Sequence, residues 1–308
     1  ENKEYYVTFV LSEIELVLDI LSDMVFTPLL KQEDIQNEAS VILEELKSYE
    51  DSPDDYVYDE YFKNIFKNHP LGQDIIGTRE SVAGATADSI QAYYKKHYIP
   101  GRMVLSIAGD YPDELIQRLS EKFFSMRVDR PLAPLTNDPV EKSFSIHFIK
   151  RNLEQVNFLL GAEGFARDFK TAVRLNVISN ILGGGMSSRL FQRIREDKGL
   201  CYSISAFPSS YLDTGIMNIN CGTSKDKLLH AVDSILEEIR LLKKDGFTED
   251  ELIFSKGNQK GGLAIGYEIP EHRMSDIAMQ EIYFGTFYGY QDRLDELFSV
   301  KLDEINDL

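Results

Sequence analysis

The chain contains an internal repeat, a strand followed by two helices and a proline, and this feature favours a fold of two related domains. The strand-like segment Tyr6–Ser12 aligns with Asn218–Ser224, and a helical pattern follows in both copies. One helix later, Asp51–Pro53 aligns with Glu268–Pro270. Two matches in the same order indicate that the sequence consists of two related halves.

The two halves are unequal in length. The second half has a long stretch, starting near Phe144, before its copy of the repeated strand, and the first half has no counterpart for it. We therefore expect a piece of the natural protein to precede Glu1. The segment 127–142 contains three prolines and is the predicted linker. The predicted domains are residues 1–128, the C-terminal part of the first domain, and residues 141–308, the second domain.

Strand and helix patterns occur in clusters and not in regular alternation, which favours an α+β fold. We expect two homologous domains, each an antiparallel sheet packed against helices, with the first domain truncated at its N-terminus. Strands are predicted at Tyr5–Val10, Met103–Ala108, Phe144–Lys150, Gln155–Gly161, Cys201–Phe207 and Gly215–Cys221, the third pairing with the fourth and the last two forming a hairpin. Helices are predicted at Gln32–Tyr49, Asp54–Phe66, Asp88–His97, Phe169–Leu182, Ser187–Asp197, Lys225–Leu242 and Glu249–Gly266, with others after Ser12, Pro112 and Pro270.

The charge balance excludes some classes of partner. The 308 residues carry 51 acidic and 33 basic side chains, a formal net charge of −18. This charge argues against nucleic acid, since affinity for nucleic acid comes from basic side chains that neutralise phosphates. No apolar run is long enough for a membrane span. Two cysteines and the lack of a secretory signal favour the cytoplasm.

Two acidic residues of the second helix are candidates for chemistry. Glu38 and Glu45 lie two turns apart on one helical face, roughly 10 Å from each other. The apolar residues between them predict a packed helix, so that a carboxylate at its edge needs a partner. That partner is a metal, a basic side chain or solvent. In the repeat, Glu38 aligns with Ser255 and Glu45 with Gly262, so the acidic pair is absent from the second copy.

The segment Gly183–Tyr202 holds further candidates. Its glycines, Gly183, Gly184 and Gly185, follow a predicted helix, whereas phosphate-binding loops follow a strand, so a flexible loop before a Ser-capped helix is favoured. Arg195 offers a planar fork of donors for carbonyl or carboxylate groups, and Tyr202 offers a hydroxyl group. Cys201 and Cys221 are placed symmetrically about Tyr211 and are candidate cross-strand neighbours, either reduced or paired.

Several stretches together resemble the pitrilysin/insulinase family of zinc metallopeptidases. The most specific is Gly183-Gly-Gly-Met-Ser-Ser-Arg-Leu-Phe-Gln-Arg-Ile-Arg195-Glu-Asp-Lys-Gly-Leu-Cys-Tyr202, which is similar to the second-domain signature of the short family members, including mitochondrial processing peptidase and its bacterial relatives. Glu38–Glu45, Pro70–Gly72, Gly77–Glu80 and Tyr98–Met103 also follow the family's order. The resemblance covers essentially the whole chain.

The resemblance implies a zinc site and a substrate-binding pair. The family's zinc is held by an inverted His-x-x-Glu-His helix and a distal glutamate. By this alignment Glu45 is the distal zinc ligand and Glu38 a supporting catalytic residue, whereas the His-x-x-Glu-His segment is expected upstream of Glu1. Arg195 and Tyr202 are implied to bind the substrate backbone, and the glycines of Gly183–Gly185 to aid substrate entry.

The implied function is zinc-dependent endopeptidase activity on peptides or unfolded segments inside a closing chamber, with one zinc ion as cofactor. Lacking two of its three zinc ligands, the 308-residue chain is expected to be inactive alone. Short family members imply a homodimer or a heterodimer with a related chain, and the acidic charge is compatible with basic peptide substrates. Two alternatives stay open: a non-catalytic scaffold or partner subunit, and an acidic peptide-binding module.

Overall fold

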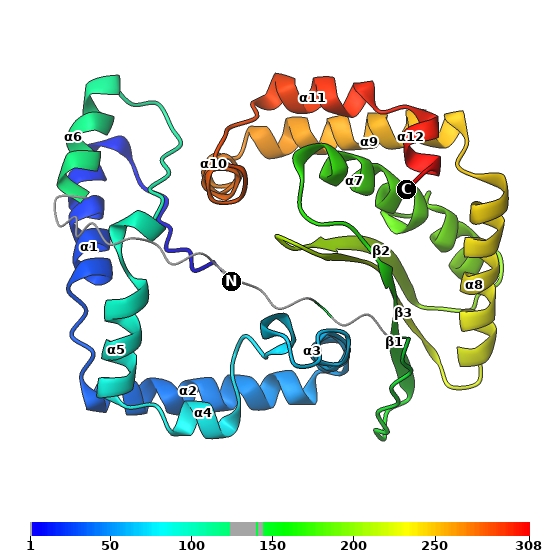
Figure 1. The fold of residues 1–308 in the computed structure, drawn as a ribbon, viewed down its shortest axis with the longest axis horizontal. Helices are drawn as coiled ribbons and strands as arrows, with labels where there is room; N and C mark the ends of the chain where they lie inside the picture. The colour runs from blue at the N-terminus through cyan, green and yellow to red at the C-terminus, as the bar shows by residue number, and fades with distance from the viewer. Residues whose placement is uncertain (1, 124–139, 141–143) are drawn as a thin grey trace. The chain divides into compact units, whose positions relative to one another are not determined.

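The computed structural model describes residues 2–123, 140 and 144–308 (Figure 1). The fold is α+β, as predicted, because the described residues combine many helices with a three-stranded antiparallel sheet. The predicted linker, residues 127–142, lies outside the described residues except for Val140. No described helix is both long and apolar enough to cross a lipid bilayer. The predicted cytoplasmic location stays a prediction.

The described residues form two compact units, and each unit takes a helix from the other half of the sequence. Unit 1 comprises the described residues of Glu1–Glu50, Gln73–Pro139 and Ile269–Ile282, and unit 2 those of Asp51–Gly72, Val140–Glu268 and Tyr283–Leu308. The chain crosses between units at the two aligned triplets of the repeat, next to Pro53 and Pro270. The duplication therefore includes a reciprocal helix exchange. The domain boundaries expected from the sequence stay a prediction.

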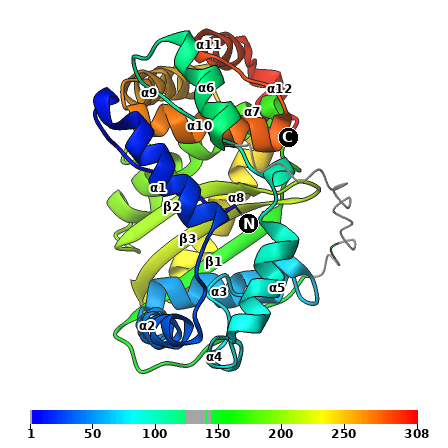
Figure 2. The same ribbon diagram turned by 90° about the vertical axis from the view of Figure 1, so that its left-hand side faces the viewer.

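Unit 1 is mostly helical, and Figure 2 looks onto its helices α1 and α6. Its core is a cluster in which Ile14 and Leu18 of α1 pack against Leu119 and Phe123 of α6. Arg118 and Glu15 join the same helices on the surface, with 2.5 Å between guanidinium nitrogen and carboxylate oxygen. The elements are η1 (Leu11–Glu13), α1 (Ile14–Phe26), α2 (Gln32–Asp51), α4 (Arg79–Ala83), α5 (Ala87–His97), η3 (Pro100–Arg102), α6 (Asp113–Phe123) and most of α10 (Pro270–Phe284).

The two strands predicted in the first half are wrong. Tyr5–Val10 and Met103–Ala108 form no strand among the described residues. Alternate residues of the second segment still face the core, since Leu105 and Ile107 pack against the α1–α6 cluster. A period-two pattern reports which side chains are buried, whereas a strand also needs a neighbouring strand to accept its backbone hydrogen bonds.

Unit 2 contains the sheet, formed by β1 (Gln155–Glu163), β2 (Ser203–Ser210) and β3 (Gly215–Ser224). The strand order is β1-β3-β2 and both pairings are antiparallel, so the predicted hairpin is confirmed. The predicted pairing of Phe144–Lys150 with β1 is wrong, because β1 pairs with β3 and Phe144–Lys150 is not a strand. Phe144 and Phe148 are instead 92% and 88% exposed.

Helix α3 (Pro53–Ile65) is the exchanged helix in unit 2, and it packs against the sheet. The Tyr61 hydroxyl donates to Oδ1 of Asn218, a fully buried residue of β3, over 2.7 Å. A side chain at Gly161 would collide with the Tyr61 hydroxyl, so this glycine makes room for the ring on β1. Burial raises the pKa of Tyr61. The tyrosine thus serves as a neutral hydrogen-bond donor that holds α3 in place.

The remaining helices of unit 2 form two clusters with the sheet. One cluster joins β2 and β3 to η4 (Phe191–Glu196), a π-helical turn, and to α8 (Leu228–Asp245) through Leu190, Ile194, Ile204, Cys221 and Ile235. The other joins α7 (Phe169–Gly183) to α9 (Glu249–Tyr267), α11 (Tyr290–Ser299) and α12 (Leu302–Asn306). The remaining element is the short η2 (Pro70–Gly72).

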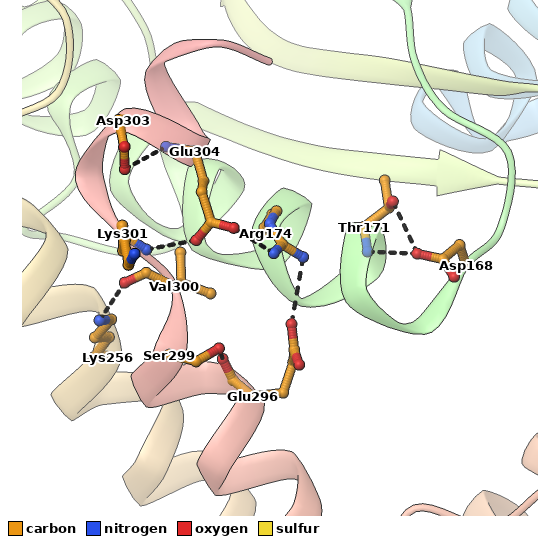
Figure 3. A network of polar contacts seen from close by, with 10 residues as sticks. All are labelled: Asp168, Thr171, Arg174, Lys256, Glu296, Ser299, Val300, Lys301, Asp303 and Glu304. Carbon is orange, nitrogen blue, oxygen red and sulfur yellow. Dashed lines mark hydrogen bonds and ion pairs between the residues drawn. The ribbon is translucent and has the colours of Figure 1, made fainter.

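Polar contacts fasten the C-terminal helices to α7 and α9 (Figure 3). Arg174 of α7 contacts Glu304 over 2.5 Å and Glu296 over 3.3 Å. The hydrogen bond from Arg174 lowers the pKa of Glu304. From α9, the Lys256 ammonium group donates to the Val300 carbonyl, which satisfies an oxygen just beyond α11. These contacts fix α11 and α12, which the sequence reading did not predict.

Candidate functional site

The two candidate carboxylates lie on α2 of unit 1, on an exposed surface. Glu38 and Glu45 are both exposed, and neither has a hydrogen-bond or ion-pair partner among the described residues. The prediction of a packed helix is confirmed only in part, because Ala39, Ile42 and Leu43 are half-buried and Leu46 is buried, whereas Val41 is 53% exposed. The described residues therefore cover part of the apolar face of α2, and Glu38 and Glu45 lie at exposed positions of the same helix.

The second copy of the repeat shows what covers the equivalent surface there. Ser255 of α9, the counterpart of Glu38, is fully buried, and its hydroxyl lies 3.4 Å from the Val177 carbonyl of α7. A little further along, the side-chain amide of Asn180 donates to Asn258 of α9 over 3.0 Å. In unit 2, therefore, helix α7 covers α9 at the position equivalent to Glu38 with uncharged polar groups, whereas Gly262, the counterpart of Glu45, is exposed.

Metal binding is limited by the number of available ligands. The described residues contain no group of three or more His, Cys, Asp or Glu side chains that could hold a metal ion. An exposed carboxylate such as Glu45 has the right donor atoms for zinc but supplies one ligand, and zinc in proteins needs three or four. The described residues therefore do not make a zinc site by themselves, and the role of Glu45 as ligand stays a prediction.

The three candidate glycines differ in their surroundings. Gly183 is buried at the end of α7, where a Cβ atom would lie 2.3 Å from the Ala206 backbone nitrogen of β2. Gly184 and Gly185 are exposed. The helix expected here forms over residues 189–196, but its serine cap is wrong, because the Ser188 hydroxyl donates backwards to the Gly185 carbonyl over 2.6 Å. Gly183 thus has a packing role, whereas a substrate-binding role for the glycines stays a prediction.

Gly183→Ala should destabilise the natural full-length protein by about 2–3 kcal/mol, because its methyl group collides with the backbone of β2 and neither backbone can easily move. Gly185→Ala is the matched control, since no atom lies within 4 Å of its added Cβ, and it should change stability by less than about 0.5 kcal/mol. Urea unfolding of both variants measures the difference. Equal stability of the two would contradict the assigned packing role.

Three arginines follow the glycines, and two of them form ion pairs with glutamates of neighbouring helices. Arg189 contacts the buried carboxylate of Glu238 over 3.7 Å and also donates to Glu251 over 2.7 Å. Arg193 contacts the same Glu238 over 2.9 Å. Although burial opposes it, hydrogen bonding from Arg189 keeps the pKa of Glu251 below its usual value. These pairs tie the turn after α7 to α8 and α9.

Arg195 differs from the other two arginines. Its side chain is 42% exposed, its nearest acidic oxygen belongs to the adjacent Glu196 at 3.9 Å, and its guanidinium group lies 4.6 Å from the centre of the Phe191 ring. Stacking on an aromatic ring orients a guanidinium group and leaves its donors available. Of the three arginines, Arg195 is the one that does not contact the buried carboxylate of Glu238.

Tyr202 lies immediately before β2 and is 55% exposed. Its backbone N–H donates to the Gly222 carbonyl of β3 over 2.8 Å. The hydroxyl group has no partner among the described residues. Arg195 and Tyr202 are therefore two exposed polar side chains at the two ends of one short turn, each held by an ordered backbone.

The cysteines next to this turn are free and buried. The strand register places Ile204 opposite Cys221, but Cys201 lies close enough for its thiol to hydrogen-bond with that of Cys221, so the expectation of neighbouring cysteines is confirmed, with both reduced. A hydrogen bond with Cys221 lowers the pKa of Cys201, and the charge of Arg195 lowers it further. The same hydrogen bond and burial raise the pKa of Cys221. Both side chains fill the core cluster under the sheet.

Sequence reasoning missed the residues that support the candidate turn. Glu238 is 3% exposed and forms ion pairs with Arg189 and Arg193. Thr223 is fully buried, and its hydroxyl donates to the Leu200 carbonyl. A signal for Glu238 was present, since Arg189 and Arg193 are four residues apart and share a helical face that needs a carboxylate. Thr223 gave no signal, because a threonine in a strand is ordinary.

Comparisons with known proteins agree with the geometry. Residues 1–79 match the family model described as Insulinase (Peptidase family M16), and residues 84–256 match the one described as Peptidase M16 inactive domain. Glu38 and Glu45 fall in the first match, and Arg195 and Tyr202 in the second.

The similar proteins include relatives named as proteases. An uncharacterized zinc protease of Bacillus subtilis, YmxG, is 37% identical over 310 residues, which span 100% of this chain and 75% of the relative. One from Mycobacterium leprae is 31% identical, with 100% and 70% covered. The crystal structure of a peptidase M16 inactive domain from Pseudomonas fluorescens superposes with a TM-score of 0.89 at 19% identity, covering 97% of this chain and 71% of that one. A protease from Helicobacter pylori gives 0.86 at 20%, covering 96% and 73%. At such identities the structures establish the fold alone.

Proposed function

The chain belongs to the M16 family of peptidases, and from this premise we propose that the natural protein is a zinc-dependent endopeptidase that cleaves peptides or unfolded segments. Residues 1–79 carry the metal-site half of the chemistry, and residues 84–256 carry the substrate-binding half. The zinc-protease names of the relatives support the metal and the reaction class.

The observation that carries the proposal is the contrast between α2 and α9. In α9 the repeated position is a buried serine that faces a neighbouring helix, whereas in α2 it is Glu38, followed two turns later by Glu45, on an exposed face. The counterparts of the two carboxylates in α9 are the buried Ser255 and the exposed Gly262, so a helix that serves only packing has no need for two unpartnered carboxylates at these positions. A metal site explains why α2 carries two carboxylates at positions where α9 carries none.

Each residue has a distinct proposed role. Glu45 is one zinc ligand, Glu38 supports the site, and the remaining ligands come from the natural protein outside these 308 residues, since the Bacillus subtilis relative extends beyond the match by a quarter of its length. Zinc, when bound, polarises the peptide carbonyl and activates water for hydrolysis.

The substrate is held by the second half. Arg195 donates to backbone carbonyl groups of the peptide, for which its exposed and stacked guanidinium group is suited. Tyr202 donates its hydroxyl to the carbonyl oxygen as negative charge develops there. Gly184 and Gly185 give an exposed segment beside this turn that aids substrate entry. We expect the working protein to pair with a second copy or a related chain.

A scaffold or partner subunit without catalysis is the second candidate. The match of residues 84–256 to an inactive domain and the lack of a three-ligand group in the described residues favour it. The exposed Arg195 and Tyr202 argue against it, because a scaffold has no chemical use for this pair.

Hydrolysis of a quenched fluorescent peptide by the natural full-length protein tests the proposal. A peptide rich in Lys and Arg is the first choice, since the net charge of −18 favours basic substrates. Hydrolysis should stop on incubation with 1,10-phenanthroline and return when Zn²⁺ is added. Hydrolysis that the chelator does not affect would contradict the zinc mechanism. Zinc-free protein that binds a related chain but cleaves no peptide would establish the scaffold instead.

A further inference from the structure

The turn between Arg195 and Tyr202 is fastened to one neighbouring segment, the end of β3 and the start of α8. The Lys227 ammonium group donates to the Gly199 carbonyl over 2.9 Å. The Thr223 hydroxyl donates to the Leu200 carbonyl over 2.5 Å. The Tyr202 N–H also donates to the Gly222 carbonyl, so three hydrogen bonds hold the turn from the same side.

Thr223 occupies a special place in the sheet. Its backbone lies opposite Val156 of β1, whereas on the other side the pairing with β2 ends one residue earlier, at Ser203 opposite Gly222. The Thr223 hydroxyl therefore bonds to the segment that precedes β2, beyond the point where the pairing of β3 with β2 ends. Thr223 is fully buried, so its hydroxyl and the carbonyl it contacts depend on each other for hydrogen bonding.

The backbone of the turn needs this support. Gly199 has a φ angle of +58°, a left-handed conformation that ends the η4 turn and points the chain back toward the sheet. The Leu200 N–H donates back to the Ile194 carbonyl over 2.9 Å, which anchors the turn to η4 at the Arg195 end. Thr223 supplies the anchor toward the sheet, between the two candidate substrate-binding residues.

We propose that Thr223 is a positioning residue, which fixes the turn carrying Arg195 and Tyr202 for the binding of a peptide backbone, with Lys227 as a weaker second fastening. The inference rests on the proposed function, since Arg195 and Tyr202 are the groups it positions. Lys227 contributes less because its ammonium group is exposed and keeps its water when the bond opens.

Peptidase kinetics of the natural full-length protein test the proposal. Thr223→Val keeps the shape of the side chain and removes the donor, and it should lower kcat by roughly 10- to 100-fold with a smaller change in KM, because a misplaced Tyr202 hydroxyl acts chiefly on the transition state. Thr223→Ser keeps the donor and should restore kcat to within about threefold of the wild type. Lys227→Met, at an exposed position, should fold normally and lower kcat by less than about tenfold.

Hydrogen exchange supplies a readout that does not depend on activity. The amides of Leu200 and Tyr202 should exchange faster in Thr223→Val and at the wild-type rate in Thr223→Ser, with amides in the middle of β3 unchanged. A Thr223→Val protein with wild-type kcat, or with unchanged exchange in the turn, would overturn the proposal. If Thr223→Val does not fold, wild-type exchange of the Leu200 and Tyr202 amides in Thr223→Cys, whose thiol is a weaker donor, would overturn it. A wild-type protein that cleaves no peptide would refute the proposed function, while the exchange data still decide whether Thr223 holds the turn.

Discussion

Replacement of Tyr202 by phenylalanine in the natural full-length protein should lower kcat for peptide hydrolysis by roughly 10²–10³-fold, the usual cost of losing a donor to the developing oxyanion. The substitution removes one oxygen atom. Because the side chain is 55% exposed and its hydroxyl has no partner among the described residues, no buried group is left unsatisfied. The loss of rate should therefore come without a loss of stability.

Tyr93→Phe is the matched control for Tyr202→Phe. Tyr93 is also exposed, at 60%, and its ring stacks on His97 with 4.3 Å between ring centres, which the substitution preserves. This variant should keep the wild-type kcat, and both variants should show the wild-type unfolding midpoint. Full activity of Tyr202→Phe would remove the tyrosine from the proposed mechanism. An equal loss in both variants would indicate a general effect on the protein.

The sequence predicted most helices because their signals are local. Thr248 and Glu251 form a capping box at the start of α9, and Gly199 has the positive φ angle typical of a helix end. Ser12 and Glu15 have the spacing of another capping box, but the Ser12 hydroxyl bonds to Glu13 and α1 begins without a side-chain cap. The residue types were suitable there, but the 3₁₀ turn before α1 places them differently.

Long-range pairing was less predictable. The hairpin of β2 and β3 was found because its strands are adjacent in sequence, whereas the pairing of β1 with β3 joins strands separated by α7, η4 and β2. The exchange of α3 into unit 2 was also missed. Its tyrosines indicate a helix with a buried face, but only the fold shows that Tyr61 reaches Asn218.

Of the candidate site, the exposed residues could be predicted from the sequence. Arg195 and Tyr202 carry the resemblance and are exposed in the structure, as a role in binding requires. The buried groups behind them depend on contacts across the fold: the spacing of Arg189 and Arg193 indicates that a carboxylate is needed but does not identify Glu238, and no local pattern reveals Thr223. Gly183 was assigned to substrate binding by its motif, and its contact with β2 gives it a packing role that spacing does not indicate.

Replacement of Glu45 by glutamine should abolish zinc retention and lower kcat/KM by more than about 100-fold, beyond the 10–100-fold range of residues that only support a ligand. A neutral amide is a poorer zinc ligand than a carboxylate and does not offset the charge of the ion. Glu38→Gln should fall within that 10–100-fold range, since its role is to support the site. Neither change should alter the stability of the metal-free protein, because both side chains are exposed on α2.

Glu44→Gln is the matched control, as it removes the same charge from the neighbouring exposed position of the same helix. The most direct test is the zinc content of the natural full-length protein and of its Glu45→Gln and Glu44→Gln variants after dialysis against metal-free buffer. The account predicts zinc in a one-to-one ratio in the wild type and in Glu44→Gln, and none in Glu45→Gln. Full zinc retention by Glu45→Gln, or a wild-type protein without zinc, would contradict it.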